Sequence, residues 1–155
     1  MKKLLIDADC IIKISKAGIK ERVLDCFNTF ISESVRQEVI ERGLEKGCED
    51  AIVVKNNIVK GKLKTVENRT GVSGDEAIIK NFNRTEYDFV GTDDKRFIKR
   101  LVVMDIPYLV PGLLIYHIFQ SNKISKEEGL SFLEKLSLFV SDDEYQIVRF
   151  LLKGE

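Results

Sequence analysis

Four acidic side chains in separated parts of the chain could bind divalent cations if the fold brings them together. They are Asp7, Glu38, Asp75 and Asp94. Charged side chains are almost never buried without a partner, so acids at inward positions need an explanation. Carboxylates gathered in one cleft repel one another unless a cation neutralises them. Hard cations such as Mg²⁺ or Mn²⁺ favour oxygen ligands, so the four acids predict a metal site.

Two of these acids follow apolar segments. Residues 3–7 form a continuous apolar run that ends on Asp7, which is typical of a strand buried on both faces of a parallel sheet. Residues 87–92 predict another strand, and Asp93 and Asp94 follow it. Ligands bind at the carboxyl ends of parallel strands, especially where the strand order switches. If the two strands are neighbours, their acids share one crevice.

The other two acids lie in predicted helices. Glu38 comes one residue before Val39 and shares the apolar side of its helix, so we expect it to face inward. Asp75 precedes Ile78 by three residues, which places it, rather than Glu76, on the inward stripe of the next helix. Both acids are therefore predicted to point toward the interior.

Each acid taken singly has a simpler explanation. Asp75 could complement the dipole of its helix, Asp93 and Asp94 could cap the helix that follows them, and Glu38 could be a partly exposed edge residue. Four inward acids from four segments, without a matching set of inward bases, are hard to explain as caps alone. The metal site remains the better hypothesis for the set.

Short apolar segments alternate with amphipathic ones along the whole chain, a βα pattern that predicts an α/β fold. The sheet is expected to be central and mostly parallel, with four to five strands. Strands are predicted at residues 3–7, 29–31, 62–66 (at an edge), 87–92 and 107–110. Helices are predicted at residues 9–27 (in two pieces separated near Gly18), 32–41, 49–59, 75–82 and 95–101, and another begins at Pro111.

Two later helix starts match the S-x-x-E capping box, Ser125 with Glu128 and Ser141 with Glu144. We interpret both as structural. The C-terminal helices, at about 112–153, are expected to pack on the domain or to form an oligomer interface.

The composition limits the classes of function. Lys+Arg and Asp+Glu both number 25 in 155 residues, so net charge gives no sign of nucleic-acid binding. Three separated cysteines and a single histidine, His117, argue against a zinc site. Reduced cysteines and no signal peptide predict a cytoplasmic protein. The longest apolar run, 113–119, is too short to span a bilayer, so no membrane role is expected.

Four short motifs resemble those of the PIN-domain family, in the family's order and spacing. They are LLIDADCII at 4–12, VRQEV at 35–39, SGDEA at 73–77 and VGTDDKRF at 90–97. Members are mostly metal-dependent ribonucleases and include the toxins of many toxin–antitoxin pairs. This chain departs from the family at Asp9, where a small hydroxyl residue is common, and at Asp93. Asp75 and Glu76 compete for one role.

The resemblance implies a single PIN-like domain over 1–155, with three α/β/α layers, that hydrolyses RNA as an endoribonuclease. Asp7, Glu38, Asp75 and Asp94 would be catalytic and would hold Mg²⁺ or Mn²⁺, with Asp93 as a further ligand. The cation would lower the pKa of a water and stabilise the leaving oxygen. A homodimer and an antitoxin protein are the implied partners. The RNA backbone could be held by a set of cations that could equally form a solvated helix face: Lys95, Arg96, Lys99 and Arg100, with Lys13 and Lys16.

Two other functions remain open. A haloacid-dehalogenase-like phosphatase would use Asp7 as nucleophile and Asp9 as acid–base, but Cys10 and Ile11 do not fit its usual motif and no motif lysine is evident. A catalytically silent PIN-like module could bind RNA or serve in assembly. Retention of all four acids argues against that second alternative.

Overall fold

The computed structural model describes residues 1–47, 49–67, 74–83 and 85–154. Its described part contains a five-stranded, all-parallel sheet in the order β3-β2-β1-β4-β5. The strands are β1 Lys3–Ile6, β2 Asn28–Ser32, β3 Leu63–Val66, β4 Phe89–Gly91 and β5 Tyr108–Leu109. The predicted α/β class and central sheet are confirmed, and β3 lies at an edge as expected.

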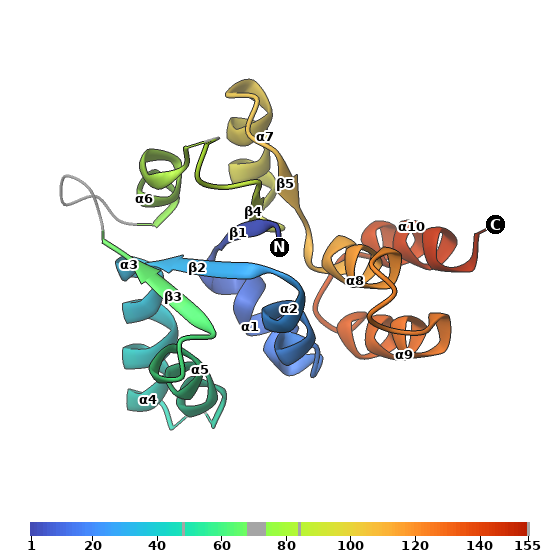
Figure 1. The fold of residues 1–155 in the computed structure, drawn as a ribbon, viewed down its shortest axis with the longest axis horizontal. Helices are drawn as coiled ribbons and strands as arrows, with labels where there is room; N and C mark the ends of the chain where they lie inside the picture. Colours follow the sequence, from blue (N-terminus) through green and yellow to red (C-terminus); the bar gives the residue numbers. More distant parts are fainter. Residues whose placement is uncertain (48, 68–73, 84, 155) are drawn as a thin grey trace.

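Helices cover both faces of this sheet (Figure 1), with α1, α2, α4 and α5 on one side and α6 and α7 on the other. This completes the three predicted layers. The helices before β4 are α1 Ala8–Lys16, α2 Lys20–Cys26, α3 Glu33–Arg36, the π-helix η1 Gln37–Glu41, α4 Arg42–Glu45, α5 Glu49–Val59 and α6 Gly74–Asn81. The later ones are α7 Lys95–Val103, α8 Pro111–Gln120, α9 Lys126–Leu136 and α10 Asp142–Lys153.

The strand order changes direction at β1. The chain proceeds from β1 to β2 and β3 on one side, and then returns to place β4 and β5 on the other side. The carboxyl ends of β1 and β4 therefore meet at the switch point, where ligands bind in open α/β sheets. Ile6 pairs with Gly91, and the backbone N–H of Asp7 donates to the Gly91 carbonyl at 2.9 Å. The two strands that carry the predicted acids are thus neighbours.

The core forms around β1, whose residues Leu4, Leu5 and Ile6 have no exposed surface. This fits a strand covered on both faces. The predicted break near Gly18 is also confirmed, because Gly18 takes a positive φ of 75° between α1 and α2. Glycine adopts this conformation without the steric cost that a Cβ would bring.

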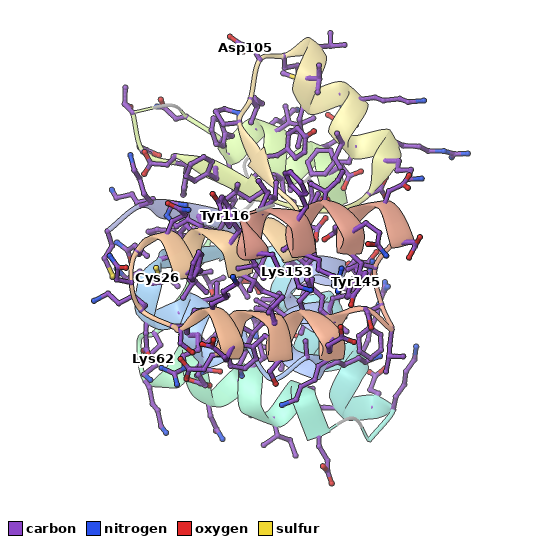
Figure 2. The ribbon with its side chains drawn as sticks, turned by 90° about the vertical axis from the view of Figure 1, so that its right-hand side faces the viewer. Cys26, Lys62, Asp105, Tyr116, Tyr145 and Lys153 are labelled. Atoms are coloured by element: carbon purple, nitrogen blue, oxygen red, sulfur yellow. The ribbon has the colours of Figure 1, made fainter. Side chains whose placement is uncertain are left out.

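The C-terminal helices share the same core. α8 contacts α1 and α2, α9 contacts α1, and α10 packs on α8 and α9. Figure 2 shows α9 and α10 side by side, and the Tyr145 hydroxyl of α10 donates to Glu134 of α9. Their buried residues in the core are Leu114, Ile115, Ile118, Leu133, Leu136, Val148 and Leu152.

No helix in the described part of the chain is long and apolar enough to cross a membrane. Two features named in the sequence lie outside the described residues. They are Ser73, the first residue of the third acidic motif, and Cys48.

Candidate metal centre

Asp7 lies at the end of β1 and is 7% exposed. Its Oδ1 accepts a hydrogen bond from the backbone N–H of Cys10 at 2.8 Å, which caps α1, and its Oδ2 accepts one from the Thr92 hydroxyl. Burial, aided by the charges of Asp9 and Asp93, raises the pKa of Asp7 to about 7 in spite of both hydrogen bonds. A buried acid with acidic neighbours, as the sequence predicted, is therefore present at the switch point.

Asp94 caps the helix that follows β4. Its Oδ1 accepts from the backbone N–H groups of Arg96 at 2.9 Å and Phe97 at 3.1 Å. Its own N–H donates to the buried Thr92 hydroxyl at 3.2 Å, and that hydroxyl donates to Asp7. The capping explanation is thus correct for Asp94. Thr92 links the two acids and gives the VGTDDKRF motif at 90–97 a physical basis.

Asp75, in the first turn of α6, lies within electrostatic reach of Asp94. Burial raises the pKa of Asp75, and the charge of Asp94 raises it further, with a smaller effect from Asp9. Glu76 points to a different partner, because Arg100 of α7 donates to its carboxylate. The geometry therefore favours Asp75 over Glu76 as the acid of this motif.

Glu38 does not face inward as predicted, because its side chain is exposed. The prediction assumed 3.6 residues per turn, whereas Glu38 lies in the π-helical η1, whose wider i→i+5 turns change the direction of each side chain. It lines a surface hollow together with Gly74, the residue before Asp75. Glu38 is therefore at the rim of the site and not at its centre.

Asp93, predicted as a further metal ligand, is engaged in an ion pair. Its Oδ2 lies 2.5 Å from Nζ of Lys13 on α1, and its side chain is mostly buried. Burial lowers the pKa of Lys13, but the hydrogen bond and charge of Asp93 outweigh that effect and raise it. This pair joins α1 to the corner between β4 and α7 and leaves Asp93 less suited to bind a cation. Asp9 is exposed.

Glu144 is an acid of this region that the sequence did not identify as a site residue. The Ser141 hydroxyl accepts from the N–H of Glu144 at 3.2 Å, but the carboxylate does not return to Ser141. Instead it accepts from the N–H of Gly112 at 2.8 Å. The capping box predicted here is thus only half formed. Burial and the charge of Asp93 raise the pKa of Glu144, whereas the hydrogen bond from Gly112 lowers it by a smaller amount.

The carboxylates of this site must meet the coordination requirements of a divalent cation if they bind one. Among the described residues, no three His, Cys, Asp or Glu side chains form a cluster that could hold a metal ion by themselves. Mg²⁺ commonly keeps several waters and takes only one or two protein carboxylates. Asp75 and Asp94 supply hard oxygen ligands whose repulsion a cation would relieve, and Thr92 joins Asp94 to Asp7. The residues fit a hydrated Mg²⁺ or Mn²⁺.

Cations lie beside this site, and the histidine lies away from it. Four exposed cations follow Asp94 along α7, namely Lys95, Arg96, Lys99 and Arg100. His117 packs against Phe27 and Phe89, which lie at the amino ends of β2 and β4. The carboxylates are at the opposite end of the sheet, so His117 does not belong to their site.

No protein-family model matches this chain, and a search of curated proteins finds no match.

Proposed function

We propose that this chain is a metal-dependent endoribonuclease of the PIN type. The observation that carries the proposal is the meeting of Asp7 and Asp94 at the switch point between β1 and β4, joined by Thr92, with Asp75 in electrostatic reach. Asp7 and Asp94 come from separate segments and are joined through Thr92, and the charge of Asp94 reaches Asp75 in a third segment. Capping explains the backbone contacts of Asp7 and Asp94 but not the place of this third acid.

In this proposal Asp75 and Asp94 bind Mg²⁺ or Mn²⁺, and Asp7 supports them from the buried side. The bound cation would supply the charge that makes a nearby water more acidic and stabilises the leaving oxygen of the phosphodiester. Thr92 fixes the backbone of Asp94 next to Asp7, because its hydroxyl accepts from the N–H of Asp94 and donates to the Asp7 carboxylate. The exposed cations of α7 contact the phosphates of the RNA backbone, and Glu38 lies at the rim where the substrate enters.

The partners and location belong to the same proposal. Ile147 and Phe150 expose apolar surface on α10, which supports a homodimer through the C-terminal helices. An antitoxin protein is expected from the resemblance to PIN-domain toxins. A cytoplasmic location agrees with Cys10 and Cys26, which are unpaired thiols.

The test is cleavage of mixed-sequence single-stranded RNA in Mg²⁺ or Mn²⁺, with EDTA as the blank. Asp94→Asn should lower the rate by about 100-fold or more, because a bound cation is worth several kcal/mol to the transition state. Asparagine is also a good N-cap, so α7 should remain folded. Asp25→Asn is the matched control, since Asp25 is exposed at the end of α2, near the amino end of β2.

Two results would overturn this function. No cleavage by the wild type in either metal, with Mn²⁺ raising its melting temperature but not that of Asp94→Asn, would indicate a silent binding module. Release of phosphate from small phosphomonoesters, dependent on Asp7, would indicate the phosphatase. RNA cleavage that Asp25→Asn retains and Asp94→Asn loses supports the nuclease.

A further inference from the structure

A pocket of about 280 Å³ lies between α1 and the segment formed by η1 and α4, with α5 on its third side. Of its lining residues, only Glu38 and Lys16 have a role in the function proposed above. Its volume is at the lower end of the roughly 300–1,000 Å³ typical of small-molecule sites, which suits one nucleotide unit and not a larger ligand.

The pocket has two chemically different parts. Its apolar wall consists of Ile12, Val39, Ala51 and Val54, of which the last three are buried. Its cationic part consists of Lys16, Arg42 and Lys46, all exposed. Among the lining side chains that the structure describes, Glu38 is the single carboxylate beside these three cations. An apolar wall beside several cations fits a planar ring that carries a phosphate.

The pocket adjoins the acidic site along two paths. Lys16 is seven residues after Asp9 on the same face of α1, about 10 Å along the helix axis. Glu38 lines both this pocket and the hollow that reaches Gly74, next to Asp75. A single strand that passes the carboxylates can therefore continue into the pocket.

We propose that this pocket binds one nucleotide of the single-stranded RNA substrate, with the base on the apolar wall and its phosphate at Arg42 and Lys46. This inference rests on the proposed nuclease function and names the place where the strand is held beside the cleavage site. Nζ of Lys16 already lies 5.4 Å from the centre of the Phe139 ring, so the other two cations are the better ones to change.

The experiment measures binding without cleavage. A short fluorescein-labelled single-stranded RNA is titrated with protein in EDTA and followed by fluorescence anisotropy at several salt concentrations. The double variant Arg42→Gln/Lys46→Gln should bind at least about tenfold more weakly at low salt, and the slope of log K against log[salt] should fall by about 0.7, the value for one phosphate of a single strand. The melting temperature should be unchanged, because both side chains are exposed.

Arg22→Gln/Lys123→Gln is the matched control. It removes the same charge from another pocket, which lies at the far ends of α2 and α8. Binding like the wild type is expected. An oligonucleotide with abasic sites should bind the wild type more weakly than the intact one, and this difference should shrink in the Arg42→Gln/Lys46→Gln variant.

The outcomes separate this inference from the proposed function. Equal RNA binding by the wild type and both double variants, or no binding at all, overturns the pocket, whatever the cleavage assay shows. The inference is also overturned if free AMP displaces the labelled RNA while the Arg42→Gln/Lys46→Gln variant binds RNA as tightly as the wild type. That result would indicate a site for a free nucleotide. If only the Arg42→Gln/Lys46→Gln variant loses RNA binding and the wild type does not cleave RNA, the pocket is supported and the nuclease function is rejected.

Discussion

The helices α9 and α10 begin with the same S-x-x-E motif but use its glutamate differently. In α9, the N–H of Glu128 donates to the Ser125 hydroxyl at 3.1 Å, and the Glu128 carboxylate accepts from the N–H of Ser125 at 2.8 Å. In α10, the N–H of Glu144 likewise donates to the Ser141 hydroxyl, but the Glu144 carboxylate accepts from the N–H of Gly112 at the start of α8. The serine contact is therefore decided locally, whereas the carboxylate contact is decided by the neighbouring helix.

The environment of each carboxylate explains the difference. Glu128 is exposed, and its nearest cation, Arg22, lies 3.5 Å away. Glu144 is partly buried against α8, where Gly112 has no side chain to keep it away. The pKa values move in opposite directions. The backbone hydrogen bond from Ser125 lowers the pKa of Glu128, whereas burial raises that of Glu144.

The largest effect that tests this comparison is expected from adding a methyl group at Gly112. A Cβ there would lie 2.8 Å from Cγ2 of Val148 and 3.2 Å from Oε1 of Glu144. We expect Gly112→Ala to lower the free energy of unfolding by about 2–3 kcal/mol, measured in urea. Gly129→Ala in α9 is the control, because its Cβ would lie 3.2 Å from the end of the Leu152 side chain and would otherwise make ordinary contacts, such as that with Ile124 at 3.7 Å.

At Gly129 the gain in helix propensity, about 1 kcal/mol, should offset the tight contact, so the net change should be near zero. Equal losses for the two alanine variants would show that the α8–α10 contact is no closer than the α9–α10 contact.

A smaller effect is expected from removing each glutamate. Glu144→Ala leaves the N–H of Gly112 without its partner in a buried place, so the free energy of unfolding should fall by about 1–2 kcal/mol. Glu128→Ala should cost less, because water can replace its exposed carboxylate. Urea denaturation of both variants measures the difference, and a larger loss for Glu128→Ala would reverse the comparison.

The smallest effect is in the pH dependence of stability. Glu144 has a raised pKa, so its contribution is present below the ordinary value of 4.5 and is lost as the pH rises through the folded-state pKa. Glu128 has a lowered pKa, so its contribution is present above 4.5 and is lost as the pH falls through the folded-state pKa.

From about pH 3 to about pH 7, Glu144→Gln should therefore gain stability relative to the wild type, mostly above pH 4.5, and Glu128→Gln should lose it, mostly below pH 4.5. The measurement is the melting temperature of each variant and the wild type across this range. Shifts of the same sign in both variants would contradict the opposite environments inferred for the two glutamates.

Much of the fold could be predicted because its signals are local. The apolar run of β1, the break at Gly18 and the proline that opens α8 each express a preference of a few neighbouring residues. The sequence predicted that the acids share a crevice only if β1 and β4 are neighbours. It could not predict that pairing, because no single segment determines the order of the strands. The neighbouring positions of Asp7 and Asp94 followed once that condition was met.

The parts of the site that could not be predicted depend on distant contacts or irregular backbone. Lys13 and Asp93 are 80 residues apart in sequence, and Gly112 and Glu144 are 32 apart, so no local pattern indicates either pair. Glu38 was assigned to the wrong face because a regular helix was assumed where the chain forms a π-helix. Each miss concerns where a side chain points, and not which element carries it.

The Thr92 bridge also affects when the site can form during synthesis. Asp7 and Thr92 are 85 residues apart in sequence, so their contact closes a long loop and comes late compared with local structure. A nascent chain that ends before residue 92 already contains the whole of β1 and α1 but has no partner for Asp7 at the switch point. For the ribonuclease proposed above, this order would keep Asp7 and Asp94 apart until the segment that contains Thr92 has been made.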